Sequence, residues 1–313
     1  MLVKRLGWIV GAALLLGAFS TFSADQPPSV MAGALTRDGI GARAIALGGA
    51  FTAVADDATA GYYNPSGLAH VPGLSVGGMY ESKFDPSLGT SFQYASGTYF
   101  LDGVHLGAGL TWVRRSDTGI LTQDGSFDTS ESLVMLSGGY EVLGPLESEG
   151  GRGLAIGASA KLYAARGYAE ARASGIGADL GALVTLPLGA WEAALGLRSS
   201  DILGSRIRWS GTPNEIVEVV PWGQHLGIAL RHPELGASAV VDVSLFFGQP
   251  ELNSVRIGAE YVLWAIAIRA GLKDGTPVFG VGVAPFDWLQ VDFAVVLHGA
   301  MGSSLVASME VNF

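Results

Sequence analysis

Hydrophobic and polar residues alternate with a period of two along most of the chain, and the C-terminal residues show this most simply. Between Ser303 and Phe313 one parity carries apolar side chains and the other carries mostly polar ones, with Val306 as the exception. Upstream, Arg256 and Glu260 likewise occupy the polar parity of an alternating segment. This period is typical of β-strands that have one apolar and one polar face.

Turn-forming residues divide the alternating region into segments of strand length. The division predicts fourteen strands, near residues 74–84, 90–101, 103–115, 130–143, 152–166, 170–187, 190–201, 219–231, 236–247, 252–264, 265–274, 275–285, 286–297 and 303–313. An even number of such strands is typical of a transmembrane antiparallel β-barrel. We therefore predict an all-β chain with a barrel domain over residues 74–313.

The lengths of the connections predict an orientation for the barrel. Bacterial outer-membrane barrels have short periplasmic turns and longer outer loops. If the N-terminus is periplasmic, the turns at 102–103, 188–189 and 286–287 are all inner and short, and the longest connections, 116–129 and 202–218, are outer loops.

The first residues predict export from the cytoplasm. Lys4 and Arg5 precede an apolar run over 6–19, and small residues follow near Ser23. This pattern predicts a signal peptide over residues 1–23. Beyond it, no apolar stretch approaches the ~20 residues that a membrane-spanning helix needs. The predicted location is the bacterial outer membrane.

Composition narrows the function classes further. Charged residues make up only 15% of the chain against 49% hydrophobic, and the formal net charge is −10. A soluble domain has about 25% charged residues. The acidic balance excludes a basic surface for nucleic acid. The chain has no cysteine, and its histidines form no local catalytic or zinc motif. We expect no enzymatic activity, no metal and no cofactor.

Charged residues on the polar parity are predicted to face the lumen of the barrel. Their signs are mixed, which suits either a selectivity surface or, as we favour, an ion-pair lattice that joins barrel and plug. The predicted lumen-facing charges are Lys161, Asp179, Glu192, Arg198, Arg231, Asp242, Arg256, Glu260, Arg269, Lys273, Asp292 and Glu310.

Residues 24–73 lack the alternation and are rich in Gly and Ala, with short helical stretches predicted at 38–48 and 56–62. A fourteen-stranded barrel is too wide to be filled by its own side chains, so we predict that this segment is a hatch inside the lumen. We expect Asn64 to form a turn, because Pro65 holds it out of the helical region and its side-chain amide can bond the backbone of the residues that follow. The predicted hatch motif comprises Gly48, Gly49, Asp56, Asp57, Asn64, Pro65, Ser66 and Gly67.

Two neighbouring carboxylates in the hatch have two interpretations. Asp56 and Asp57 could ligate calcium, but no spaced set of oxygen ligands accompanies them. A helix cap or a salt bridge from plug to barrel is therefore the favoured prediction.

The hatch also carries a family resemblance. The stretch 41–60, GARAIALGGAFTAVADDATA, followed by YNPSGLA at 63–69, resembles the N-terminal signature of FadL-like outer-membrane proteins, and most closely the PorV/PorQ branch. The family's usual Asn-Pro-Ala is Asn64-Pro65-Ser66 here. The run from Arg256 to Phe313 is also similar to that branch. The resemblance implies a fourteen-stranded barrel with an N-terminal hatch.

Two functions are open at this point. The leading hypothesis is a channel that passes small hydrophobic, fatty-acid-like molecules. The alternative is a PorV-like, non-transporting carrier or scaffold of a protein secretion system. The expected partners are outer-membrane lipid and either a hydrophobic small molecule or a secreted protein. An apolar pocket beside the hatch would favour transport, and an exposed groove in the outer loops would favour the scaffold.

Overall fold

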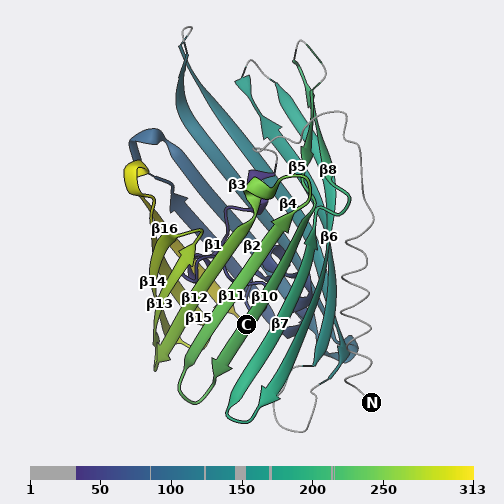
Figure 1. Ribbon diagram of the computed structural model, residues 1–313, viewed down its shortest axis with the longest axis vertical. Helices are drawn as coiled ribbons and strands as arrows, with labels where there is room; N and C mark the ends of the chain where they lie inside the picture. Colours follow the sequence, from purple (N-terminus) through teal and green to yellow (C-terminus); the bar gives the residue numbers. More distant parts are fainter. Residues whose placement is uncertain are drawn as a thin grey trace.

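A computed structural model describes residues 33–84, 86–122, 125–144, 153–168, 171–212, 214 and 216–313. The predicted signal peptide, 1–23, and the start of the predicted hatch, 24–32, lie outside these residues. Sixteen strands form one antiparallel sheet, and β1 pairs with β16 so that the sheet closes into a barrel (Figure 1).

Fourteen of these strands make the barrel wall, as the sequence predicts. They are β1 Leu74–Ser82, β2 Thr90–Leu101, β3 Leu106–Thr122, β4 Gly125–Leu143, β5 Leu154–Arg166, β6 Arg172–Leu188, β7 Trp191–Ser200, β10 Gly223–His232, β11 Ala237–Phe246, β12 Ser254–Leu263, β13 Ile266–Lys273, β14 Thr276–Phe286, β15 Leu289–Leu297 and β16 Ser303–Asn312. Short 3-10 helices in the connections are η3 Pro86–Leu88, η4 Asp102–Val104, η6 Pro250–Leu252 and η7 Gly299–Met301.

The two long connections are not loops, which corrects the prediction for 116–129 and 202–218. β3 and β4 continue as a paired hairpin beyond the rest of the wall, past a register shift between Asp117 and Ile120. The second connection folds into β8 Ser205–Ser210 and β9 Ile216–Val220, and β8 pairs with the outer part of β6. We call this side of the barrel the long-hairpin end and the opposite side the short-turn end.

The outer surface of the wall is apolar over most of its height. Ile176 is 73% exposed and Leu305 is 60% exposed, and both alternate with inward side chains on their strands. Phe313 is also exposed. Such an apolar surface is stable in lipid and not in water. A closed barrel can lie in lipid because its strands make all their backbone hydrogen bonds with one another. The barrel is therefore a transmembrane structure.

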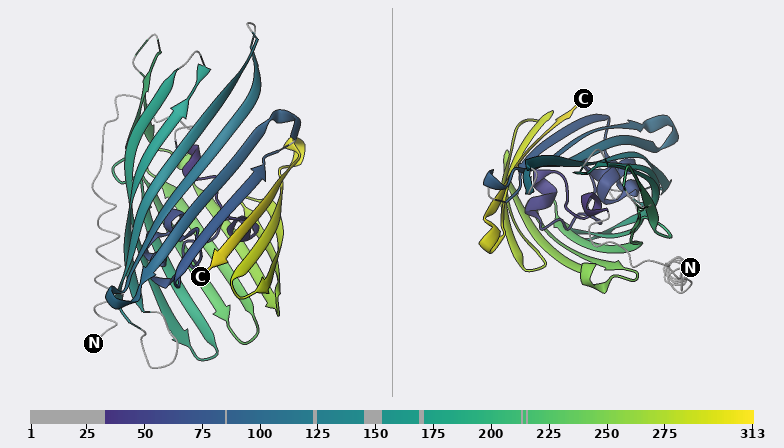
Figure 2. Two further views of the ribbon diagram at one scale, coloured as in Figure 1. Left: turned by 180° about the vertical axis from the view of Figure 1, so that it is seen from behind. Right: turned by 90° about the horizontal axis from the view of Figure 1, so that it is seen from above.

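The segment from 33 to 73 lies within the ring of strands (Figure 2). Its helices are short: η1 Ala34–Thr36, α2 Ala42–Ala46, α3 Ala60–Tyr63 and η2 Pro65–His70. The predicted helices at 38–48 and 56–62 are thus too long, because Gly39, Gly41 and Gly48 adopt positive φ and break the first of them. Among the described residues, no helix is long and apolar enough to cross a membrane.

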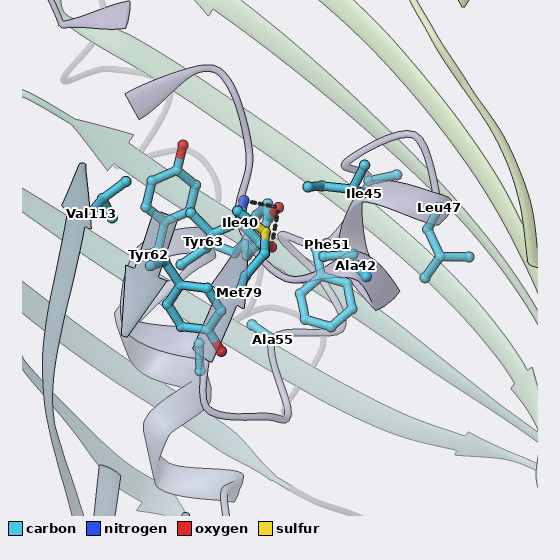
Figure 3. Close-up of a cluster of buried hydrophobic side chains, with 14 of the residues drawn as sticks. Ile40, Ala42, Ile45, Leu47, Phe51, Ala55, Tyr62, Tyr63, Met79 and Val113 are labelled. Atoms are coloured by element: carbon cyan, nitrogen blue, oxygen red, sulfur yellow. Dashed lines mark hydrogen bonds between the residues drawn. The ribbon is translucent and has the colours of Figure 1, made fainter. Parts of the chain in front are cut away.

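We call residues 33–73, the described part of the predicted hatch, the plug. It has an aromatic core of its own (Figure 3). The ring of Tyr63 makes edge contacts with Phe51 and Tyr62 at centroid distances of 5.1 and 5.0 Å. The Tyr62 and Tyr63 hydroxyls accept hydrogen bonds from the backbone amides of Gly39 and Ile40. Burial raises the pKa of both hydroxyls, that of Tyr62 to about 12. Both therefore stay neutral and also donate, to the carbonyls of Leu35 and Ile40.

Candidate functional site

Glycines on the inner face of the wall contact η2, which forms the second half of the plug. Gly107, Gly139, Gly157 and Gly181 lie directly opposite one another across β3 to β6, and we call this row the glycine belt. A Cβ atom on Gly157 would lie 2.3 Å from the backbone nitrogen of Ser66. The belt therefore lets η2 approach the wall backbone more closely than any side chain would allow.

Asn64 links this seat to the rest of the plug. Its amide donates to the carbonyls of Thr52 at 2.9 Å and Ala182 at 3.2 Å, and its oxygen accepts from Ser66. Asn64 and Ser66 are fully buried. The bond that Asn64 accepts from the Ser66 amide is the predicted bond to the backbone that follows Pro65. Gly67 packs so tightly on Ala55 that a Cβ would meet its carbonyl at 2.0 Å. The predicted turn thus begins η2 inside the barrel.

The first half of the plug is held by charges around Arg43. Its guanidinium pairs with Asp56 at 2.7 Å, Asp57 at 3.3 Å and Glu260 of β12 at 3.4 Å. We call these four residues the Arg43 cluster. Asp57 also accepts from the amide and hydroxyl of Thr59. Asp57 thus has a cap-like bond, whereas the ion pairs of Asp56 and Asp57 lie within the plug and only Arg43 extends them to Glu260 of the wall.

Burial, together with the neighbouring charge of Asp56, raises the pKa of Asp57, even though Arg43 opposes this shift. The pKa of Arg43 is raised well above its usual value, because its three carboxylate partners outweigh burial. Arg43 thus pairs with three acids, of which Glu260 is shared with Arg269 of β13.

Other predicted lumen charges bond the backbone of the plug. Asp242 accepts from the amides of Phe51 and Thr52, both at 2.9 Å. The remaining contacts run from Arg256 to the Gly49 carbonyl, from Lys273 to the Arg37 carbonyl, and from the Ala58 amide to Glu310. Gly48 and Gly49 both have positive φ where the plug meets this wall.

Asp38, on the same side, pairs with Lys83 at 2.7 Å. Burial alone would raise the pKa of Asp38, but Lys83 and Lys273 together hold it below its usual value.

Predicted charges also pair with one another within the wall. Arg269 pairs with Glu260 and Asp292. On the other side, the buried Lys161 contacts Asp179 at 2.6 Å and Asp201 at 2.9 Å. Arg198 donates to the same Asp179, and the hydroxyl of Tyr163 donates to Asp201 at 2.6 Å. This Lys161 cluster fixes Tyr163 in position.

A cavity of about 700 Å³ lies on the short-turn side of the plug. Glu192 and Arg231 face each other across β7 and β10 and line it, as do Arg43 and Asp56. These two predicted charges thus share a cavity with members of the ion-pair lattice, but among the described residues no salt bridge joins them to it. Over the described residues, no group of three or more His, Asp and Glu side chains could hold a metal ion.

A smaller pocket of about 200 Å³ lies beside the start of the plug, toward the long-hairpin end. Leu35 of the plug, Tyr163 and Ala165 of β5, and Ile207 and Trp209 of β8 form its apolar lining. Glu131 and Glu218 supply the carboxylates, and Glu218 accepts from the indole of Trp209.

Sequence reasoning missed this pocket because 202–218 was taken as a loop. The alternation of Arg206, Ile207, Arg208 and Trp209 was the signal that could have found β8.

Comparison with known proteins gives a likeness in structure only. No protein-family model and no curated protein matches the chain. The "CymD monoaromatic hydrocarbon channel" is 14% identical, with a TM-score of 0.60 over 88% of this chain and 98% of its own. The Pseudomonas putida toluene transporter TodX is 16% identical, with a TM-score of 0.56 over the same shares.

A Pseudomonas aeruginosa FadL homologue is 9% identical, with a TM-score of 0.51 over 83% of this chain and 95% of its own. None of these comparisons shows the PorV/PorQ branch or supports the scaffold alternative. The predicted outer-membrane location agrees with this likeness. The chain has the closed β-barrel fold shared by these FadL-type proteins.

Proposed function

We propose that the protein is an outer-membrane channel for small, neutral hydrophobic molecules. The pocket beside Leu35 carries this proposal, since it combines an apolar lining with a few polar groups, as ligand sites usually do. It opens where the wall and the plug meet, so a molecule bound there touches both. The apolar pocket is also the feature that the sequence analysis named as favouring transport over a scaffold.

The size of the pocket favours ring-sized ligands. A cavity of about 150 Å³ lined by aliphatic and aromatic side chains can hold benzene, and this pocket measures about 200 Å³. Trp209 and Tyr163 supply aromatic surfaces for stacking or edge contacts. We therefore place one aromatic or alicyclic ring against Ile207 and Trp209.

The carboxylates of the pocket refine the substrate class. Glu131 and Glu218 would repel a carboxylate or sulfonate that entered beside them. A neutral hydrocarbon is not repelled by these carboxylates. This argues for neutral molecules over the fatty-acid-like anions of the first hypothesis. The structural neighbours are described as a monoaromatic hydrocarbon channel and a toluene transporter, which is consistent with this choice.

Uptake by cells that carry this protein as their only such channel tests the proposal. Labelled toluene should enter faster than in cells without the protein, and benzoate should not. Ile207→Gln should slow toluene entry about tenfold or more, because it places a polar group in the apolar lining. Ile120→Gln, on the tip of β3 and away from the pocket, is the matched control. Equal toluene entry with and without the protein would overturn the channel, and an unaffected Ile207→Gln would overturn the pocket.

A further inference from the structure

The outer face of β3 to β8 carries two rows of arginine and serine near the long-hairpin end. Cross-strand pairing aligns Arg114, Ser132, Ala164, Ser174 and Arg208 in one row. The next row toward the strand ends aligns Ser116, Ser130, Arg166, Arg172 and Ser210. All of these side chains point out of the barrel, since their neighbours in sequence, such as Tyr163, Ala173 and Ile207, are buried on the inner side.

The row just below is apolar on β3 to β6, and Arg206 of β8 lines a hollow with Leu162 and Ile176. Trp112, Val134, Leu162 and Ile176 align across the same strands, and Leu162 and Ile176 are 59% and 73% exposed. On β5, the outward Ile156 and Leu162 are exposed and apolar, and Ala164 and Arg166 follow them toward the strand end. The arginine rows therefore lie directly beyond the apolar surface of these strands, where the interface of the membrane is expected.

The two rows form a basic patch on an acidic protein. Arg114, Arg166 and Arg172 line a shallow hollow of about 430 Å³ with four serines, and Asp128 lines an adjoining hollow with the same three arginines. Arg206 and Arg208 are exposed on the adjoining surface. Within the described residues, no salt bridge joins Arg114, Arg166, Arg206 or Arg208 to a carboxylate. Arg166 lies directly opposite Arg172, so two guanidinium groups line the same hollow.

We propose that this patch binds the phosphate groups of a phosphorylated lipid in the outer leaflet. Guanidinium groups bind phosphate with two parallel hydrogen bonds, and serine hydroxyls add further donors. The position of the patch selects a lipid over a free anion, because the acyl chains of a lipid whose phosphate lies between Arg166 and Arg172 extend along Leu162 and Ile176. The arginines are on the outside of the wall, and none of them lines the pocket proposed for transport.

Native mass spectrometry of the purified protein in a neutral detergent tests the proposal. The probes are diphosphoryl lipid A and its dephosphorylated form. The wild type should retain the phosphorylated lipid at least about tenfold more tightly than the dephosphorylated one. R166Q/R172Q should lose most of that preference, and R166K/R172K, which keeps both charges, should retain most of it. Heat-modifiable migration on a gel checks that each variant is folded.

Three results would overturn the proposal. The first is equal retention of the two lipids by the wild type, which needs no variant. The second is an undiminished preference in folded R166Q/R172Q. The third is complete displacement of the lipid by millimolar inorganic phosphate, which would show a free-anion site. Toluene uptake by R166Q/R172Q should equal that of the wild type, so the failure of this proposal and the failure of the channel remain distinguishable.

Discussion

The two halves of the plug differ in how much charge holds them to the barrel. η2 lies against the glycine belt, where backbone meets backbone and Gly157 leaves no space for a side chain. The segment from α2 to Thr59 also packs its backbone on wall glycines, Gly258 and Gly271, and adds a charge cluster centred on Arg43. The first seat depends chiefly on shape, and the second on shape and electrostatic balance together.

This difference indicates how each half responds to change. A shape-dependent contact is insensitive to pH and salt, but an added methyl group disturbs it. A buried charge cluster tolerates small changes in packing, but it is destabilised when one partner is removed and the others stay charged. The following predictions separate the two seats.

Arg43→Gln should have the largest effect. It leaves Asp56 and Asp57 without the cation they share, while Glu260 keeps Arg269, and breaking such a buried pair costs about 3–5 kcal/mol. We expect a drop of that order in the free energy of unfolding, measured by denaturant titration in micelles, and a higher conductance in planar bilayers. Arg231→Gln, at the exposed short-turn end, is the control and should change stability by less than about 0.5 kcal/mol. Equal effects of the two variants would refute the charge-based seat.

Gly157→Val should come next, at about 1–3 kcal/mol, because overpacking forces η2 away from the wall. The same measurements apply, and the loss should persist at high salt, unlike that of Arg43→Gln. Gly97→Val on β2 is the matched control, since a Cβ there meets nothing within 4 Å. A Gly157→Val protein as stable as Gly97→Val would show that η2 does not rest on the belt.

Asn64→Ala should cost about 1–2 kcal/mol. It removes the bonds that join η2 to Thr52 and to Ala182 of β6, and buried partners are left unpaired. Hydrogen exchange of the plug amides should increase in both halves, because Asn64 connects them. Asn214→Ala, at an exposed site near β9, should leave exchange unchanged. Faster exchange in η2 alone would mean that Asn64 serves one seat only.

The smallest effect concerns pH. Because the pKa of Asp57 is raised in the folded protein, the folded state takes up this proton at a higher pH than the unfolded chain. Stability from this group therefore falls as pH rises from the usual aspartate pKa through the raised one. Asp57→Asn should remove that slope, as measured by unfolding at a series of pH values from about 4, the usual aspartate pKa, upward. An unchanged slope would assign the dependence to another group.

Asp38 should show the opposite sign. Its pKa is lowered in the folded protein, so its contribution is present above the usual aspartate pKa and is lost as pH falls through the lowered value. Asp38→Asn should therefore flatten the acid limb of the stability curve and leave the neutral region's slope unchanged.

Local pattern was sufficient to predict the wall of the barrel. The short turn between Leu263 and Ile266 is present as predicted. The wall strands are predictable because their alternation depends only on which residues face lipid. The predicted helices of the plug were less accurate, since glycines with positive φ shorten them. The β8–β9 hairpin was missed because a polar connection of that length is usually read as a loop.

The sequence by itself determined the fourteen strands of the wall, the two faces of each, and the presence of a small-residue segment to fill a wide lumen. These follow from the period of two and from the width of fourteen strands. Tertiary structure alone decided which groups meet: Arg43 with Glu260 far along the chain, Gly157 with Ser66, and Arg166 with Arg172 in one row. Those contacts depend on the register of distant strands, and no local pattern records it.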